Sequence, residues 1–176
     1  MYYFRIKSIF LWSSLLSFVL SANCANTIIT KENYFLPPHQ KYLVHIPNKG
    51  WEQIQIDKED VSLRHKQSHA TITILSSVIE HEKLTLEVLN TQLFLGIKDK
   101  KVLLKLPAVV NNRTAMHTML TGKIDTYTIK IDSYIVTEGK TVYDLVYWAP
   151  EEVFDSTHST FEEIIQTFQF TQKNIP

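Results

Sequence analysis

Alternation of apolar and polar residues along the chain predicts a β-sheet with one buried face. The clearest pattern covers residues 127–136, where Ile129 and Ile131 point to one side while Lys130 and Asp132 point to the other. A period of two is typical of a strand whose two faces meet different surroundings. We therefore expect a long antiparallel strand here, with one face against the core.

Further segments show strand-like patterns and are separated by turn signals. They are residues 42–46, 61–64, 70–76, 102–106, 115–120 and 141–148. The last of these is apolar on both faces except at Asp144, which favours a place in the middle of the sheet or beneath a helix. Residues 61–64 and 70–76 are expected to pair as a hairpin.

Two segments have the period of an amphipathic helix. In residues 83–95 leucines recur at three- and four-residue spacing, and Gly96 is placed to end the run. Near the C-terminus, Ser159 and Glu162 form the pattern of a capping box before an apolar stripe that includes Phe161. This capping box predicts that the last helix begins at Ser159.

The order of these elements indicates an α+β domain. Strands, a helix, more antiparallel strands and a final helix fit a bent antiparallel β-sheet with two or more packed helices. The sequence has no internal repeat and no Pro/Gly/Ser-rich linker. We expect a single domain over residues 42–176, preceded by an exposed lead-in over residues 25–41. A lipocalin-like or cystatin-like arrangement of similar elements is the alternative.

Residues 1–24 have the organisation of a secretory signal peptide. Arg5 and Lys7 precede an apolar segment over residues 9–20, which is short for a membrane span and gives way to polar residues. The sequence therefore predicts export, with a retained membrane anchor as the alternative.

Cys24, the single cysteine of the chain, is a candidate site of lipid attachment. It follows the apolar segment as the cysteine of a bacterial lipoprotein does, but Asn23 stands where a small residue is usual and Ser21 where a branched apolar one is usual. Ordinary signal-peptidase cleavage near Ala22 or Ala25 is the other reading. Both place the protein in the bacterial periplasm or at the membrane as a lipoprotein.

The exported part is close to neutral. Removal of residues 1–24 leaves 152 of the 176 residues, with 16 basic and 18 acidic side chains. This balance argues against nucleic acid as a partner, because binding to phosphates needs a basic surface. A lone thiol forms no disulfide within the chain, so the domain depends on its apolar core.

Histidines near the expected hairpin are the candidate metal ligands. They are His45, His65 and His69, with the cluster Glu80, His81 and Glu82. Because residues 64–68 are expected to form a turn, a solvated polar loop explains them better than a metal site. Residues 155–158 carry the side-chain types of a catalytic triad, but triads are defined by geometry and not by adjacency. We expect no catalytic, cofactor or metal site.

Asp144 is unusual because a carboxylate in so apolar a strand needs hydrogen-bond partners or a shifted pKa. We expect a structural role for it. Together with Trp51, Tyr147 and Trp148, it forms the set of candidate cleft-lining residues. Thr121, Gly122 and Lys123 lack the spacing of a phosphate-binding loop and are expected to form a turn.

Several packing motifs together resemble those of PsbP-like proteins. They are Pro47 followed by Gly50 and Trp51, the leucine-rich helix ending in Gly96, the strand at residues 142–147, and the terminal run at residues 161–168. The resemblance covers residues 42–170 and implies a non-enzymatic domain that docks onto a larger assembly. It implies no catalytic or ligand-binding residues for this chain.

Two classes of function therefore remain. The first is a membrane-tethered binding or accessory module of the cell envelope, whose partner is an envelope protein or a lipid. The second is a soluble periplasmic carrier or enzyme whose site is assembled from scattered residues such as His69, His117, Asp132 and Asp144. A concave sheet face favours the first, and convergence of the scattered residues in one pocket favours the second.

Overall fold

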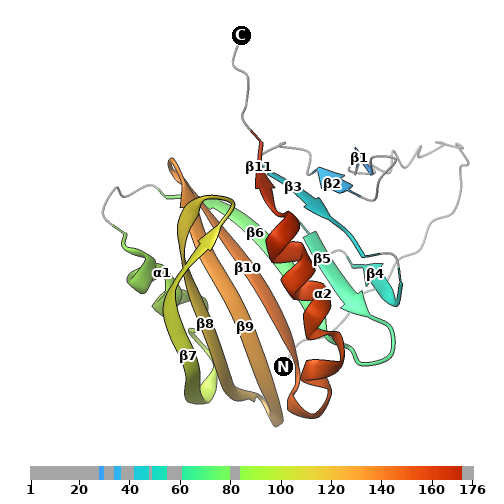
Figure 1. The fold of residues 1–176 in the computed structure, drawn as a ribbon. Coiled ribbons are helices and arrows are strands. Elements are labelled where there is room, and N and C mark those ends of the chain that lie inside the picture. Colours follow the sequence, from blue (N-terminus) through green and yellow to red (C-terminus); the bar gives the residue numbers. More distant parts are fainter. Residues whose placement is uncertain are drawn as a thin grey trace, which may run out of the picture.

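The computed structural model of the protein describes residues 28–29, 34–36, 42–47, 49–54, 61–79 and 84–171. Its main element is a seven-stranded sheet in which every pair of neighbouring strands is antiparallel (Figure 1). In spatial order the strands are β4 (Trp51–Gln53), β5 (Val61–His65), β6 (Thr71–Val78), β10 (Thr141–Pro150), β9 (Tyr127–Glu138), β8 (Arg113–Ile124) and β7 (Lys98–Val110). The expected α+β class is confirmed.

A second, smaller sheet lies beside the first and has the order β1-β2-β3-β11. Its strands are β1 (Ile28–Ile29), β2 (Tyr34–Leu36), β3 (Tyr42–His45) and β11 (Gln169–Phe170). Two of these strands, β1 and β2, fall within the segment expected as a lead-in, residues 25–41. Residues 1–24, including Cys24, lie outside the described part of the chain.

The two α-helices lie on opposite faces of the main sheet. Helix α2 (Phe154–Thr167) follows the short 3-10 helix η1 (Glu151–Val153) and packs against β10 and β3, whereas α1 (Leu86–Leu93) contacts β8 and β9 (Figure 1). We call the two sides of the sheet the α2 face and the α1 face. Neither described helix is long and apolar enough to cross a membrane.

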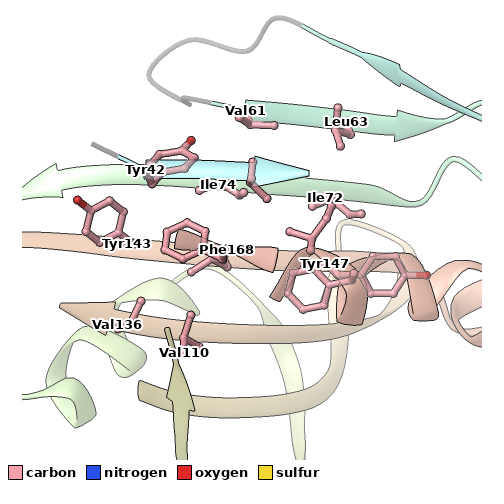
Figure 2. Packing of buried hydrophobic residues seen from close by; sticks show 14 of the residues in the cluster. Tyr42, Val61, Leu63, Ile72, Ile74, Val110, Val136, Tyr143, Tyr147 and Phe168 are labelled. Carbon is pink, nitrogen blue, oxygen red and sulfur yellow. The ribbon is translucent and has the colours of Figure 1, made fainter. Parts of the chain in front are cut away.

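The main core lies on the α2 face. Figure 2 shows Tyr143 and Tyr147 of β10 among the apolar side chains that β5, β6 and the C-terminal segment contribute, including Phe168. Phe161 of α2 is fully buried in the same cluster. A smaller cluster on the α1 face contains Phe94 with residues of β8 and β9. Because α2 buries Phe154, Phe161 and Ile164 in this core, it is the principal cover of the α2 face.

Strand β10 has the central place that its two apolar faces predicted. It pairs with β6 on one side and β9 on the other. Its odd-numbered residues, such as Tyr147, are buried against α2, while Val146 and Trp148 pack toward the α1-face cluster. The alternation predicted for β9 is also present, since Ile129 lies on the α1 face and Lys130 stands over the Phe154 ring on the other.

The predicted start of the last helix is wrong. Helix α2 begins at Phe154, so Ser159 lies within it and caps nothing. Phe154 is buried and lies seven residues before Phe161, on the same helical face. The Tyr147 hydroxyl also donates a hydrogen bond of 2.6 Å to the Phe154 carbonyl. Burial of this first turn against the sheet therefore outweighs the local capping signal.

Gly122 does not form the turn expected around it but lies inside β8, which continues to Ile124. A Cβ atom at this position would approach Ile97 Cγ2 to 2.4 Å and the Lys98 carbonyl oxygen to 3.1 Å. The missing side chain thus lets the chain that enters β7 lie directly against β8. The reversal comes later, at Asp125, whose φ is 53°.

Candidate functional site

An open groove of about 580 Å³ lies on the α1 face, and we call it the open-face groove. It is lined by Ile54, Arg64, His69, Thr71, Thr73, Ile124, Tyr127, Ile129, Trp148 and Pro150. These residues come from strands β5, β6, β8, β9 and β10, from the β5–β6 turn and from the residue after β4. The β5–β6 and β8–β9 turns lie at the same end of the sheet, near the start of α2 (Figure 1).

The floor of the open-face groove is built by cross-strand neighbours. Trp148 of β10 pairs with Thr71 of β6, and Pro150 pairs with Ile129 of β9. Residues that pair directly across antiparallel strands point to the same side of the sheet. Tyr127, the first residue of β9, also lines the groove and is 72% exposed. The groove floor therefore belongs to the strands of the sheet, and the β5–β6 turn adds His69 to its border.

The ionisable residues in the described lining of the groove are basic. Arg64 and His69 line it and are exposed, and none of its described lining residues is a carboxylate. Glu52 faces Arg64 across the β4–β5 pair, but among the described residues Arg64 forms no ion pair. Its guanidinium is thus available to a ligand that carries a negative charge.

Asp144 lies on the same face as the groove but outside its lining. Leu75 and Ile135 are its direct cross-strand neighbours on β6 and β9. Burial among apolar groups raises the pKa of Asp144 to about 6. Along this face of β10, Val146 lies between Asp144 and Trp148 and so separates the carboxylate from the groove.

A cluster of two histidines around Asp132 lies on the opposite, α2 face. Nε2 of His117 and Nε2 of His158 each donate a hydrogen bond of 2.7 Å to a different oxygen of the buried Asp132 carboxylate. Burial alone would raise the pKa of Asp132, but the hydrogen bonds from His117 and His158 lower it below its ordinary value. The cluster joins β8, β9 and α2.

Aromatic contacts hold both imidazole rings of this cluster. His117 stacks on Tyr134 with ring centroids 4.1 Å apart, and His158 stacks on Phe154 at 4.9 Å. Burial, and the nearby charge of Asp132, raise the pKa of Tyr134 to about 12, so this hydroxyl stays protonated at neutral pH. The arrangement orients two imidazoles, but among the described residues no serine or cysteine is hydrogen-bonded to them as a nucleophile.

The structure distributes the four candidate cleft-lining residues over two environments. Trp148 lines the open-face groove, and Asp144 lies on the same face. Trp51 and Tyr147 are buried members of the main core, where they are 8% and 0% exposed. Cys24 lies outside the described residues.

Of the four scattered residues that could form an enzyme site, only two meet. His117 and Asp132 are hydrogen-bonded on the α2 face, whereas His69 and Asp144 lie on the α1 face and His69 lines the groove. No single pocket therefore contains all four.

The described residues contain no group of three His, Cys, Asp or Glu side chains arranged to hold a metal ion. Nδ1 of His65 lies 2.9 Å from the Ser68 hydroxyl and within 3.2 Å of its backbone N–H, which fits the predicted hairpin turn. The residues at positions 80–82 lie outside the described part of the chain.

The sequence does not single out Arg64 or His158. Arg64 falls in the segment 64–68, for which the sequence predicts a turn, and its exposure beside an apolar floor depends on pairing with β6. His158 appears in the sequence only as part of residues 155–158. It reaches Asp132 because α2 starts at Phe154, a fact that the capping pattern obscured.

Comparison with known proteins shows similarity only at the level of structure. No protein-family model and no curated protein sequence matches the chain. The solution structure of PsbP (CyanoP) from Synechocystis sp. PCC 6803 superimposes with a TM-score of 0.61 at 12% identity, covering 78% of this chain and 91% of that one.

Two further solved structures have the same arrangement. LpqN of Mycobacterium tuberculosis, described as involved in cell envelope biogenesis, superimposes with a TM-score of 0.63 at 11% identity over 74% of this chain and 83% of that one. The protein PA94 from Pseudomonas aeruginosa gives a TM-score of 0.52 at 8% identity over 71% and 88%. At such identities the comparison establishes the fold alone. The chain has the PsbP-like fold.

Proposed function

We propose that the protein is an exported, membrane-tethered binding module of the bacterial cell envelope and not an enzyme. The observation that carries this proposal is the open-face groove, a concavity of about 580 Å³ on a rigid sheet. Ligand sites are concavities of this size with mostly apolar walls and a few polar groups. The structural likeness to LpqN, which is described as involved in cell envelope biogenesis, supports the cellular setting.

The chemistry of the described residues supports binding over catalysis. The Asp132 carboxylate uses both oxygens to hold His117 and His158, so it orients two elements of the fold. His158 is also 3.8 Å from Glu162 of the same helix. These contacts attach α2 to the sheet and leave the groove on the other face.

A soluble carrier or an enzyme is the second candidate function, and the pairing of His117 with Asp132 is the observation that favours it. A catalytic role requires His117 to exchange a proton with a substrate. Under this alternative, His117→Gln abolishes an activity while leaving ligand binding at the groove unchanged.

Export and tethering are tested by metabolic labelling with a fatty acid in a bacterial host. The full chain and the Cys24→Ser variant are compared, and the mature N-terminus is read by intact mass. Label that is present in the wild type and lost in the variant, with Cys24 as the first residue, supports the tether. An unlabelled protein in the periplasm contradicts the tether but not export, and a cytoplasmic protein contradicts both.

The binding face is tested by hydrogen exchange of the purified full chain with and without a solubilised envelope fraction. We expect protection of amides in β6, β10 and the β5–β6 turn, which border the groove. The outer part of β7 serves as the internal comparison, because it lies at the far edge of the sheet. Absence of protection around the groove contradicts the assignment of this face.

A further inference from the structure

The walls of the open-face groove match an apolar ligand body. Of the ten described residues that line it, six are apolar or aromatic: Ile54, Ile124, Tyr127, Ile129, Trp148 and Pro150. Ile124 and Tyr127 remain 42% and 72% exposed, although burial of apolar surface is favourable. A ligand that covers these side chains therefore removes apolar surface from water, and this burial stabilises the complex.

The two threonine hydroxyls of the groove are already engaged within the protein, which leaves the Tyr127 hydroxyl as the free one in the described lining. Thr71 donates from Oγ1 to the His69 carbonyl at 3.4 Å, and Thr73 Oγ1 lies 3.3 Å from Ser62 Oγ. A sugar or another polyhydroxyl ligand needs many hydrogen-bond partners, because unpaired polar groups are costly to bury. The lining thus favours an alkyl chain over a carbohydrate.

Arg64 supplies the strong cation at the rim of the groove. Among the described residues it has no ion-pair partner, and the part of the groove lining that they form contains no carboxylate. Arginine binds carboxylate and phosphate groups through two parallel hydrogen bonds. The positive charge therefore lies at one border of an apolar surface. This arrangement is complementary to an amphiphile with an anionic head.

From these contacts we propose that the open-face groove binds a single-chain anionic amphiphile. The alkyl chain lies on the apolar side chains around Trp148 and Ile129, and the carboxylate or phosphate head pairs with Arg64. The proposal names the ligand class for the binding module described above and rests on that function. It concerns the ligand alone and is independent of whether Cys24 carries a lipid.

The test is a calorimetric titration of the purified full chain with dodecanoate, dodecyl phosphate and dodecanol, each below its micelle-forming concentration. We expect both anions to bind, and Arg64→Gln to weaken them about tenfold or more, the effect of losing a charge-assisted hydrogen bond. Binding of dodecanol is expected to be weaker and unaffected by this variant. Comparison of the two anions distinguishes a fatty-acid carboxylate from a phosphate head.

Two more variants make the result specific. Glu52→Gln removes the acidic cross-strand neighbour of Arg64 and is expected to strengthen anion binding. Arg113→Gln is the matched control, because Arg113 lies in β8, near the opposite edge of the sheet, and is paired with Glu138. Its loss should leave affinity unchanged. Thermal unfolding of each variant verifies the fold.

The proposal is overturned if dodecanoate and dodecyl phosphate do not bind, or if folded Arg64→Gln binds them as tightly as the wild type. An equal loss of affinity in Arg113→Gln also overturns it, since the effect would then come from net charge. None of these results affects the hydrogen-exchange test. If an envelope component of another class protects the amides around the groove, the proposed binding function stands and only the amphiphile is rejected as its ligand.

Discussion

The buried Asp132 and the half-buried Asp144 lie on neighbouring strands, yet their pKa values move in opposite directions. Two histidines donate to Asp132 and lower its pKa despite burial. Asp144 is surrounded by Leu75 and Ile135 in the strand register, and burial raises its pKa to about 6. The difference arises because hydrogen-bond donors stabilise a buried carboxylate, whereas apolar neighbours favour its protonated form.

This environment predicts that Asp144→Asn stabilises the protein at neutral pH. The folded state binds the Asp144 proton more tightly than the unfolded chain, so the ionised carboxylate destabilises the fold above pH about 6. This destabilisation decreases as the pH falls from about 6 towards 3.8, the ordinary pKa of an aspartate. We expect a gain of about 2 kcal/mol at pH 7.5, which largely disappears near pH 4.

Urea unfolding of wild type and variant at a series of pH values measures this gain. Asp125→Asn is the control, because Asp125 is exposed in the β8–β9 turn and should give a pH-independent difference near zero. Destabilisation by Asp144→Asn at pH 7.5 would show instead that the carboxylate has a stabilising partner. The interpretation of Asp144 as a desolvated group would then be wrong.

At the scale of elements, β7 is an exposed edge strand with features that oppose pairing with another chain. It pairs with β8 alone among the described strands, and apolar side chains such as Leu103 and Val109 are 45% and 70% exposed. Four lysines, Pro107 and two register shifts interrupt this edge. Lysine, proline and bulges are the devices by which natural sheets avoid edge-to-edge association.

Removal of these devices is predicted to make the protein self-associate. In the variant Lys101→Thr/Lys105→Thr/Pro107→Val, the edge keeps its apolar residues but loses charge and gains a backbone donor. Sedimentation velocity should report a higher weight-average mass than the wild type at the same concentration. Lys49→Thr/Lys66→Thr removes two exposed lysines elsewhere and should leave the mass unchanged. An unchanged mass for the β7 variant would refute edge protection.

Strands were more predictable from the sequence than the helix boundary or the polar cluster, for physical reasons. Alternation in β9 reflects local contact of each face with core or solvent, so a short window reveals it. The start of α2 depends instead on tertiary packing, since Phe154 is buried against Tyr147 of β10 and beneath Lys130 of β9. The contact of Asp132 with His117 and His158 spans 15 and 26 residues, and only the completed sheet and helix bring these side chains together.

For the whole molecule, the two faces of the sheet differ in what they contribute. The α2 face holds most of the large buried side chains, including Phe161 and Tyr147. The α1 face carries a smaller cluster and the open-face groove, where Tyr127 is largely exposed. Burial of apolar surface is the main stabilising contribution to folding. The free energy of unfolding should therefore depend far more on the α2 face than on the open-face groove.

Two substitutions of aromatic residues compare these faces directly. Phe161→Ala creates a cavity in the main core and is expected to lower the free energy of unfolding by about 3–5 kcal/mol. Tyr127→Ala removes a side chain that is 72% exposed and should change it by no more than about 0.5 kcal/mol. Urea unfolding measures both values, with circular dichroism to verify the native fold of each variant. A large loss of stability in Tyr127→Ala would mean that the groove wall supports the fold. Substitutions that change binding at this wall would then also lower stability. A small loss of stability in Phe161→Ala would contradict the interpretation of α2 as the principal cover of the sheet.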